Sequence, residues 1–277
     1  MVQIFHDSDY EGLTWFVTEG GQIWRMNPDV GFTPWQDWPW TLVYDNPAIE
    51  FAGVAVTQYT VVAFLRDSDQ VLRSTDLQGE SWGLQTVFPS AITPVQVYTD
   101  VYAASNEIWV AAGNAEVFYT DDSGVTFTAA TAVGATCLAV AAYDGTACAG
   151  SLWDIKRSTD DGGTWTTVHS FISERVVSFG VGDHVWLALT NKGGVYISTD
   201  DGVTWTLKTR YVNHRYDSYA EAGEWGAAAM VKAASSLSHH ALALFAGGLL
   251  VSLDDGATWR AGTAGEPWVV SIDAYQP

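Results

Sequence analysis

Residues 158–165 read Ser-Thr-Asp-Asp-Gly-Gly-Thr-Trp, and residues 198–205 read Ser-Thr-Asp-Asp-Gly-Val-Thr-Trp. A third clear copy spans Ser252–Trp259, and looser copies span Asn27–Trp35, Ser74–Trp82 and Thr120–Phe127. The six copies start at positions 27, 74, 120, 158, 198 and 252. Recurrence at this spacing is the signature of a repeat architecture.

Short apolar or alternating stretches bounded by Gly, Asp and Asn lie between the copies and predict β-strands. The best-defined unit contains four such stretches: Val95–Tyr102, Ile108–Ala112, Glu116–Tyr119 and Thr126–Ala130. A repeat of four strands is a propeller blade. We therefore predict an all-β protein, a six-bladed β-propeller of four-stranded antiparallel blades in which residues 1–277 form a single domain. Seven blades are the alternative.

The residue types of the motif suit a tight turn between the third and fourth strands. Short oxygen-bearing side chains accept hydrogen bonds from turn amides, and glycine adopts a positive φ at little cost. The terminal aromatic ring would bury a large apolar surface against a neighbouring strand or blade. We assign structural roles to the motif aspartates Asp29, Asp76, Asp122, Asp160, Asp200 and Asp254, and to the rings of Trp35, Trp82, Phe127, Trp165, Trp205 and Trp259.

The pattern Ser-x-Asp-x-Gly-x-Thr-Trp resembles the Asp-box, or BNR, repeat of sialidase-like and sortilin-like β-propellers. The resemblance extends over essentially the whole chain, with three full matches and three degenerate ones. In that class the boxes lie at the blade periphery, away from the functional face. The resemblance therefore implies a fold and no particular activity.

Charge narrows the choice of partner. The chain has 12 Lys and Arg against 32 Asp and Glu, a net charge of −20, which argues against nucleic acid and against an anionic membrane surface. No apolar run approaches the length of a membrane span, and the first residues show no secretory leader. We expect no membrane insertion.

The two cysteines, Cys137 and Cys148, fall on what we predict to be adjacent strands joined by a turn at Asp144-Gly145. In that register Cys148 lies opposite Ala141, and Cys137 is several residues further along its strand. That separation is too large for a disulfide. We predict two buried free thiols.

The sequence offers few of the residue sets that catalysis would require. Sialidase chemistry needs an arginine cluster, a nucleophilic tyrosine and an acid, but several of the arginines stand directly beside the repeats. No histidine set has zinc spacing, and we expect no metal, no cofactor and no catalytic residue. A generic glycosidase would need two carboxylates on the face opposite the boxes, where the candidates are Glu19, Glu50, Asp67, Asp69, Glu116, Asp154, Glu174 and Glu266.

The stretch between Trp205 and Ser252 is the longest between two copies, and its surplus lies in residues 208–225. Aromatic and arginine side chains of the kind that segment carries are typical of recognition surfaces. We predict that it binds a partner through Arg210, Tyr211, His214, Arg215, Tyr216, Tyr219 and Trp225. The alternative is that the segment packs across the rim or plugs the central channel.

These observations predict a non-enzymatic binding or assembly module, structural or receptor-facing in a virus or phage particle. Its partners would be other protein subunits or a surface glycan, and it would be located in the virion or otherwise in the cytoplasm. The alternative is a glycoside hydrolase or glycan-binding protein that uses the acidic face opposite the boxes. An assembly factor similar to photosystem-associated propellers is a third candidate, which the lack of a visible basic patch disfavours.

Overall fold

The computed structural model describes residues 3–6, 14–18, 20–26, 40–57, 59–99, 106–112, 116–130, 133, 136–182, 184–210, 226–232, 239–245, 248–252, 258 and 260–262. Within these ranges the secondary structure consists of β-strands, which form six four-stranded antiparallel sheets. We number these sheets 1 to 6 in chain order. The prediction of an all-β chain with four-stranded units is confirmed.

Sheets 1 to 3 contain β1 (Gln3–His6), β2 (Thr14–Val17), β3 (Gln22–Met26), β4 (Trp40–Asp45), β5 (Phe51–Val56), β6 (Val61–Leu65), β7 (Gln70–Ser74), β8 (Gly83–Thr86), β9 (Pro94–Thr99), β10 (Ile108–Ala112), β11 (Glu116–Thr120) and β12 (Thr128–Ala129). Sheets 4 to 6 contain β13 (Cys137–Tyr143), β14 (Thr146–Ser151), β15 (Asp154–Ser158), β16 (Thr166–Ser170), β17 (Val176–Gly182), β18 (Val185–Thr190), β19 (Gly194–Ser198), β20 (Thr206–Arg210), β21 (Gly226–Lys232), β22 (His239–Phe245), β23 (Gly248–Ser252) and β24 (Arg260–Gly262).

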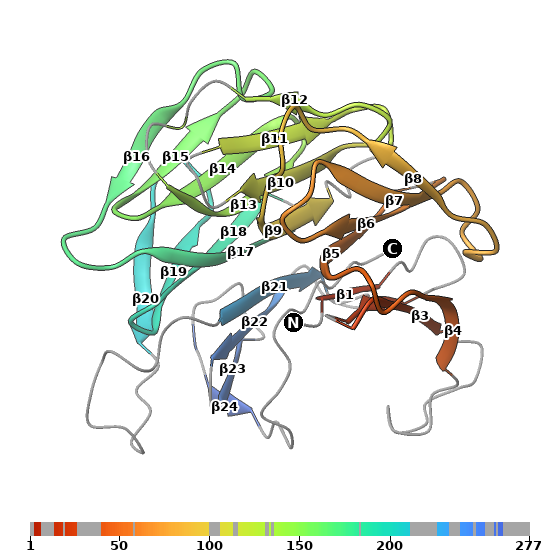
Figure 1. Cartoon of the computed structure of the whole chain (residues 1–277). Coiled ribbons are helices and arrows are strands. Elements are labelled where there is room, and N and C mark those ends of the chain that lie inside the picture. Colours follow the sequence, from red (N-terminus) through yellow and green to blue (C-terminus); the bar gives the residue numbers. More distant parts are fainter. Residues whose placement is uncertain are drawn as a thin grey trace.

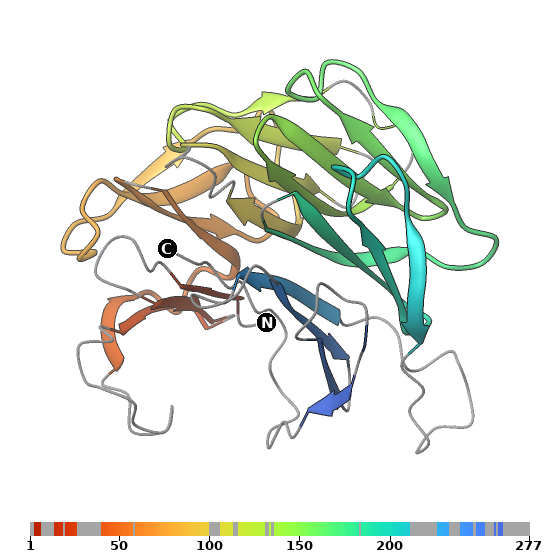
Figure 2. The same ribbon diagram turned by 180° about the vertical axis from the view of Figure 1, so that it is seen from behind.

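Each sheet is a simple meander in which consecutive strands pair with one another. The first strands of successive sheets, β5, β9, β13, β17 and β21, lie next to one another in chain order. Figures 1 and 2 show the sheets following one another around a common centre, with these first strands nearest to it. Neighbouring sheets therefore face one another, and each must bury apolar side chains on both faces.

The burial pattern follows this arrangement. Every residue of β5, β6 and β10 is buried, whereas the fourth strands β8, β12, β16 and β20 are largely exposed. The apolar clusters span neighbouring sheets; one of them joins Trp15 of sheet 1 to Val54 and Leu72 of sheet 2. The sheets are therefore stabilised by packing against each other.

The repeated turns are closed by their own polar side chains. Ser158 Oγ donates to Asp160 Oδ1 over 2.8 Å and accepts from the Gly162 amide over 3.0 Å. The amide and hydroxyl of Thr164 both donate to the Asp160 carboxylate over 2.8 Å. The turn at 198–205 repeats these bonds within a few tenths of an ångström. These bonds satisfy turn amides that the sheet ladder leaves unpaired.

The carboxylate at the centre of the turn is held in its charged form. The backbone amide of Thr164, followed by the hydroxyls of Ser158 and Thr164, lowers the pKa of Asp160. Hydrogen bonds to the charged form of a carboxyl group favour that form. The hydrogen bonds of this turn therefore favour the ionised form of Asp160.

The four repeated turns that the structure describes in full also dock on the preceding sheet. A positive φ at the motif glycine brings its backbone close to the neighbouring sheet: a Cβ built on Gly202 would lie 2.6 Å from Cys148 Sγ. In three cases an arginine of the preceding sheet donates to a carbonyl beside that glycine. The three bonds run from Arg25 to Gln78 O, from Arg73 to Ser123 O and from Arg157 to Asp201 O, at 2.6, 2.9 and 2.6 Å.

The cysteines lie where the hairpin prediction placed them. β13 and β14 are joined at Asp144-Gly145, and Cys148 pairs with Ala141. Both thiols are free and buried, and burial raises the pKa of Cys137 to about 12. They belong to the apolar interior.

Candidate functional site

The meander gives every sheet two distinct ends. The repeated turns and the turns between first and second strands lie at one end, which we call the turn face. Because successive strands alternate in direction, the turns between second and third strands and the connectors between sheets lie at the other end, the connector face. Loops on a rigid scaffold are the usual carriers of binding function.

On the connector face of sheet 5, one partly buried carboxylate organises a polar cluster. Glu174 accepts a hydrogen bond from Thr190 Oγ1 over 2.7 Å and forms an ion pair with Arg210, the last residue of β20. Arg210 also reaches the hydroxyl of Tyr196 at 3.5 Å. The cluster therefore joins the connector before β17 to the outer strand of the same sheet.

The charges of this cluster stabilise one another. Burial raises the pKa of Glu174, but hydrogen bonds from Arg210 and Thr190 outweigh it, and the pKa lies below its ordinary value. The bond to Glu174 raises the pKa of Arg210. A carboxylate in this state is held as an anion and is a poor proton donor near neutral pH. Glu174 is thus suited to positioning Arg210 and not to acting as a general acid.

The connector between sheets 4 and 5, residues 171–175, is clamped from both sides. The amide of Phe171 donates to Trp153 O over 2.7 Å, in the turn between β14 and β15. On the other side Arg175 and Asn191 exchange two hydrogen bonds of 3.0 Å. Lys192 Nζ donates to Ser173 Oγ over 2.8 Å.

Two large apolar side chains of this clamped region face the solvent. Ile172 is 100% exposed and Trp153 is 56% exposed. The neighbouring Phe171 is buried, and Phe88 and Val133, which stand at the same distance after their motif aromatic residues, are buried as well. Phe171 therefore fills the internal position, and Ile172 is left outside. The repeat register is the sequence signal that could have separated the two.

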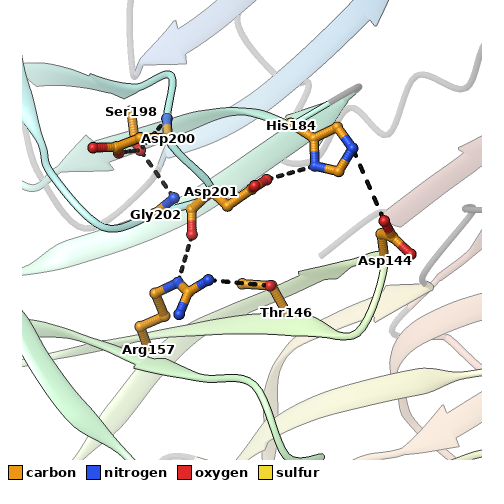
Figure 3. A network of polar contacts seen from close by, with 8 residues as sticks. All are labelled: Asp144, Thr146, Arg157, His184, Ser198, Asp200, Asp201 and Gly202. Carbon is orange, nitrogen blue, oxygen red and sulfur yellow. Dashed lines mark hydrogen bonds and ion pairs between the residues drawn. The ribbon is translucent and has the colours of Figure 1, made fainter.

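A second polar network lies on the turn face between sheets 4 and 5 (Figure 3). His184 Nδ1 lies 2.6 Å from Asp201 Oδ1, and its Nε2 lies 3.9 Å from Asp144 Oδ2. The ring also packs edge-on against Tyr143. A catalytic triad requires a nucleophile on the histidine nitrogen that faces away from the acid. Both ring nitrogens of His184 instead face carboxylates, which makes this network a cross-link between turns.

The acids predicted for the connector face are largely engaged by neighbouring groups. Glu50 lies 3.8 Å from Arg66, and Asp154 lies 4.0 Å from Lys156. Asp154 also accepts from Ser151, as Asp67 does from Thr93. Glu19 and Glu266 lie outside the described residues.

Of the predicted partner-binding residues, Arg210 is described, and it belongs to the Glu174 cluster. The others lie outside the described residues: Tyr211, His214, Arg215, Tyr216, Tyr219 and Trp225. The same holds for the motif residues Asp29, Trp35, Asp254 and Trp259. Trp153, Ile172 and Lys192 were not singled out by the sequence.

Two further features concern metal binding and membrane insertion in the described part of the chain. No group of three His, Cys, Asp or Glu side chains is placed there to hold a metal ion. No helix in that part has the length and apolarity needed to cross a bilayer.

Comparison with known proteins identifies the fold of the chain through solved structures alone. No family model matches the chain, and no curated protein sequence matches it. Among solved structures, the chain is similar to YCF48 bound to a D1 peptide, with 18% identity, a TM-score of 0.61, and coverage of 95% of this chain and 84% of that one. A chain of the mitotic checkpoint complex matches with 7% identity, a TM-score of 0.66, and coverage of 98% and 82%.

A GH74 xyloglucanase from Xanthomonas campestris matches with 16% identity and a TM-score of 0.65, covering 94% of this chain and 44% of that one. These similarities, together with the four-stranded antiparallel sheets, show that the chain has a β-propeller fold. At such identities the likeness concerns the fold alone.

Proposed function

We propose that this chain is a non-enzymatic binding module whose connector face holds a protein partner. The observation that carries the proposal is the clamped connector 171–175, which exposes Ile172 completely beside the half-exposed Trp153. Hydrogen bonds on both sides fix the backbone that carries these side chains before any partner arrives, which lowers the entropic cost of binding. Similar propellers solved with a peptide or within a protein complex support the proposal.

A photo-crosslinking amino acid at position 172 tests this proposal in a lysate from the source organism. The matched control is position 59, because Tyr59 is 59% exposed in the turn between β5 and β6, on the turn face. We expect protein adducts from position 172 and not from position 59. Equal labelling of both positions, or labelling of neither, would contradict the proposal.

We propose further that residues 1–277 form one closed, six-bladed ring of the Asp-box type. Six four-stranded sheets in the described residues and the bonding of the repeated turns support this. An experimental structure in which the last sheet contacts the first would establish the ring. A seventh sheet, or an open arc, would refute it.

The location of the protein is a separate proposal. We place the protein in a virus or phage particle, with the cytoplasm as the alternative, because of the acidic composition and the resemblance to propellers of tail and adhesion proteins. Co-sedimentation with a large particle before and after a high-salt wash tests this. Sedimentation as a free monomer would remove the virion placement and leave the binding role untouched.

A glycan ligand is the rival. The exposed indole of Trp153 offers a flat apolar surface, and a xyloglucanase shares the fold. Calorimetry with xyloglucan oligosaccharides, and an assay for their hydrolysis, separates the two functions. Saturable glycan binding that Trp153→Ala abolishes would favour the rival.

A further inference from the structure

We propose that Trp153, Ile172 and Lys192 form one docking surface, here called the junction patch, for an extended acidic protein segment that carries an apolar side chain. The inference deepens the proposed function, on which it rests, by naming the surface and the chemistry of the partner. Three features support it: the continuity of the patch, its rigidity and its local charge.

Continuity follows from the backbone. Ile172 lies in a connector that is hydrogen bonded to the Trp153 turn on one side and to the Asn191 turn on the other. Lys192, the residue after Asn191, donates to Ser173 beside Ile172. The three members of the patch therefore lie on adjacent loops of sheets 4 and 5, although they are far apart in sequence.

The turn that carries Trp153 is fixed from within. Ser151 Oγ accepts from the amides of Trp153 and Asp154 over 3.3 and 3.2 Å, and the same hydroxyl donates to the Asp154 carboxylate. The carbonyl of Trp153 is held by Phe171. An exposed aromatic ring on an ordered turn has the properties of an interface anchor, since it offers much apolar area with little rotamer freedom to lose.

Charge at the junction is opposite to that of the chain as a whole. Around the connector, the cationic side chains of Lys192 and Arg210 both act on the carboxylate of Glu174, so two positive charges face one negative charge. This local excess of positive charge lies in a chain with a net charge of −20. Beside the patch, Asp154 and Lys156 offset one another. Charge complementarity therefore selects a partner segment with carboxylates next to its apolar side chain.

The connector between sheets 2 and 3 differs from the connector at 171–175, because it leaves no such side chain exposed at the matching positions. There Phe88 and Ile92 are both buried, and Ile92 is bridged to Ser68 of the β6–β7 turn. The connector at 171–175 buries only one of its two large apolar side chains. An added apolar side chain from a partner would cover the second one.

The test uses the full-length chain and a phage library of random twelve-residue peptides, with enriched peptides resynthesised for affinity measurements. We expect peptides with an apolar residue flanked by Asp or Glu, and affinity that weakens as salt rises. Ile172→Ser, Trp153→Ala and Lys192→Glu should each weaken binding by at least about tenfold. Tyr59→Ser is the control and should leave binding unchanged, and thermal unfolding verifies that each variant is folded.

The outcomes separate the inference from the proposed function. If enriched peptides bind but ignore the three substitutions, the junction patch is wrong while protein binding stands. If basic or uncharged peptides are enriched, the acidic partner is wrong. If no peptide is enriched and position 172 gives no crosslink, the binding module itself fails. Binding that survives in Lys192→Glu at high salt would also overturn the charge argument.

Discussion

Docking of the turn at 198–205 on the preceding sheet can be tested by adding one methyl group. Gly202 has a φ of +77°, and a Cβ at this position would lie 2.6 Å from Cys148 Sγ in sheet 4. Gly145 has a φ of +71°, but a Cβ there would meet nothing within 4 Å. Both alanine variants bear the backbone cost of a left-handed conformation, and only one of them bears a clash between sheets.

The magnitudes follow from these two environments. The left-handed backbone costs roughly 1–2 kcal/mol per residue with a Cβ, and overpacking adds about 1–3 kcal/mol. We therefore expect Gly202→Ala to destabilise the chain by about 2–5 kcal/mol and Gly145→Ala by about 1–2 kcal/mol. Loss of chain entropy in the unfolded state is common to both variants and cancels in the comparison.

Thermal unfolding at a fixed scan rate measures the difference, which should amount to roughly 2–12 °C between the two variants. Cys148→Ala supplies the second arm, because it removes the sulfur that the new methyl group meets. The double variant should recover about 1–3 kcal/mol relative to additivity. Equal destabilisation by Gly202→Ala and Gly145→Ala, or strict additivity with Cys148→Ala, would show that the turn does not dock as described.

Three further predictions concern the same framework. Cys137 and Cys148 should resist iodoacetamide in the native state and react after denaturation, since both are buried; mass spectrometry that finds native labelling would contradict this. Arg157→Met should destabilise the chain by about 1–2 kcal/mol, because the carbonyl of Asp201 loses its charged donor; an unchanged urea midpoint would argue against the bond between sheets. The pKa of Asp160 is lower in the folded chain than in the unfolded chain, where it is about 3.9. The stabilisation by Asp160 is therefore fully present at pH values above the unfolded pKa, and it is lost as the pH falls through the folded pKa. Asp160→Asn should therefore lower the unfolding midpoint at pH 7 and flatten its acid dependence, and an acid profile that matches the wild-type profile would refute this role.

The strand arrangement could be predicted from the sequence because its signals are local. The pairing of Cys148 with Ala141 follows once Asp144-Gly145 is recognised as a two-residue turn. The bonds within the motif follow from residue types that lie two and four positions apart, as in Ser158 with Asp160. Such features depend on short-range chain geometry, which the sequence displays directly.

The sequence offered Glu174 and Arg210 as separate candidates, but their contact could not be predicted because it is not local. Glu174 and Arg210 are 36 residues apart, and no period in the sequence connects them. Their meeting depends on which end of β20 reaches the connector before β17. The arginines before the motifs illustrate the same limit. The sequence shows that Arg73 and Arg157 directly precede motif turns, but only the packed sheets show that each bonds to the turn of the next sheet.

The acidic composition is a poor guide to the partner for a physical reason. In the repeated turns, carboxylates such as those of Asp122, Asp160 and Asp200 accept hydrogen bonds from their own turns. Their number therefore reflects how often the turn is repeated. Net charge alone would favour a basic partner, whereas the cations around the connector at 171–175 favour an acidic one. At physiological salt, charges beyond about 8 Å are largely screened, so the groups beside Ile172 should decide which segment binds.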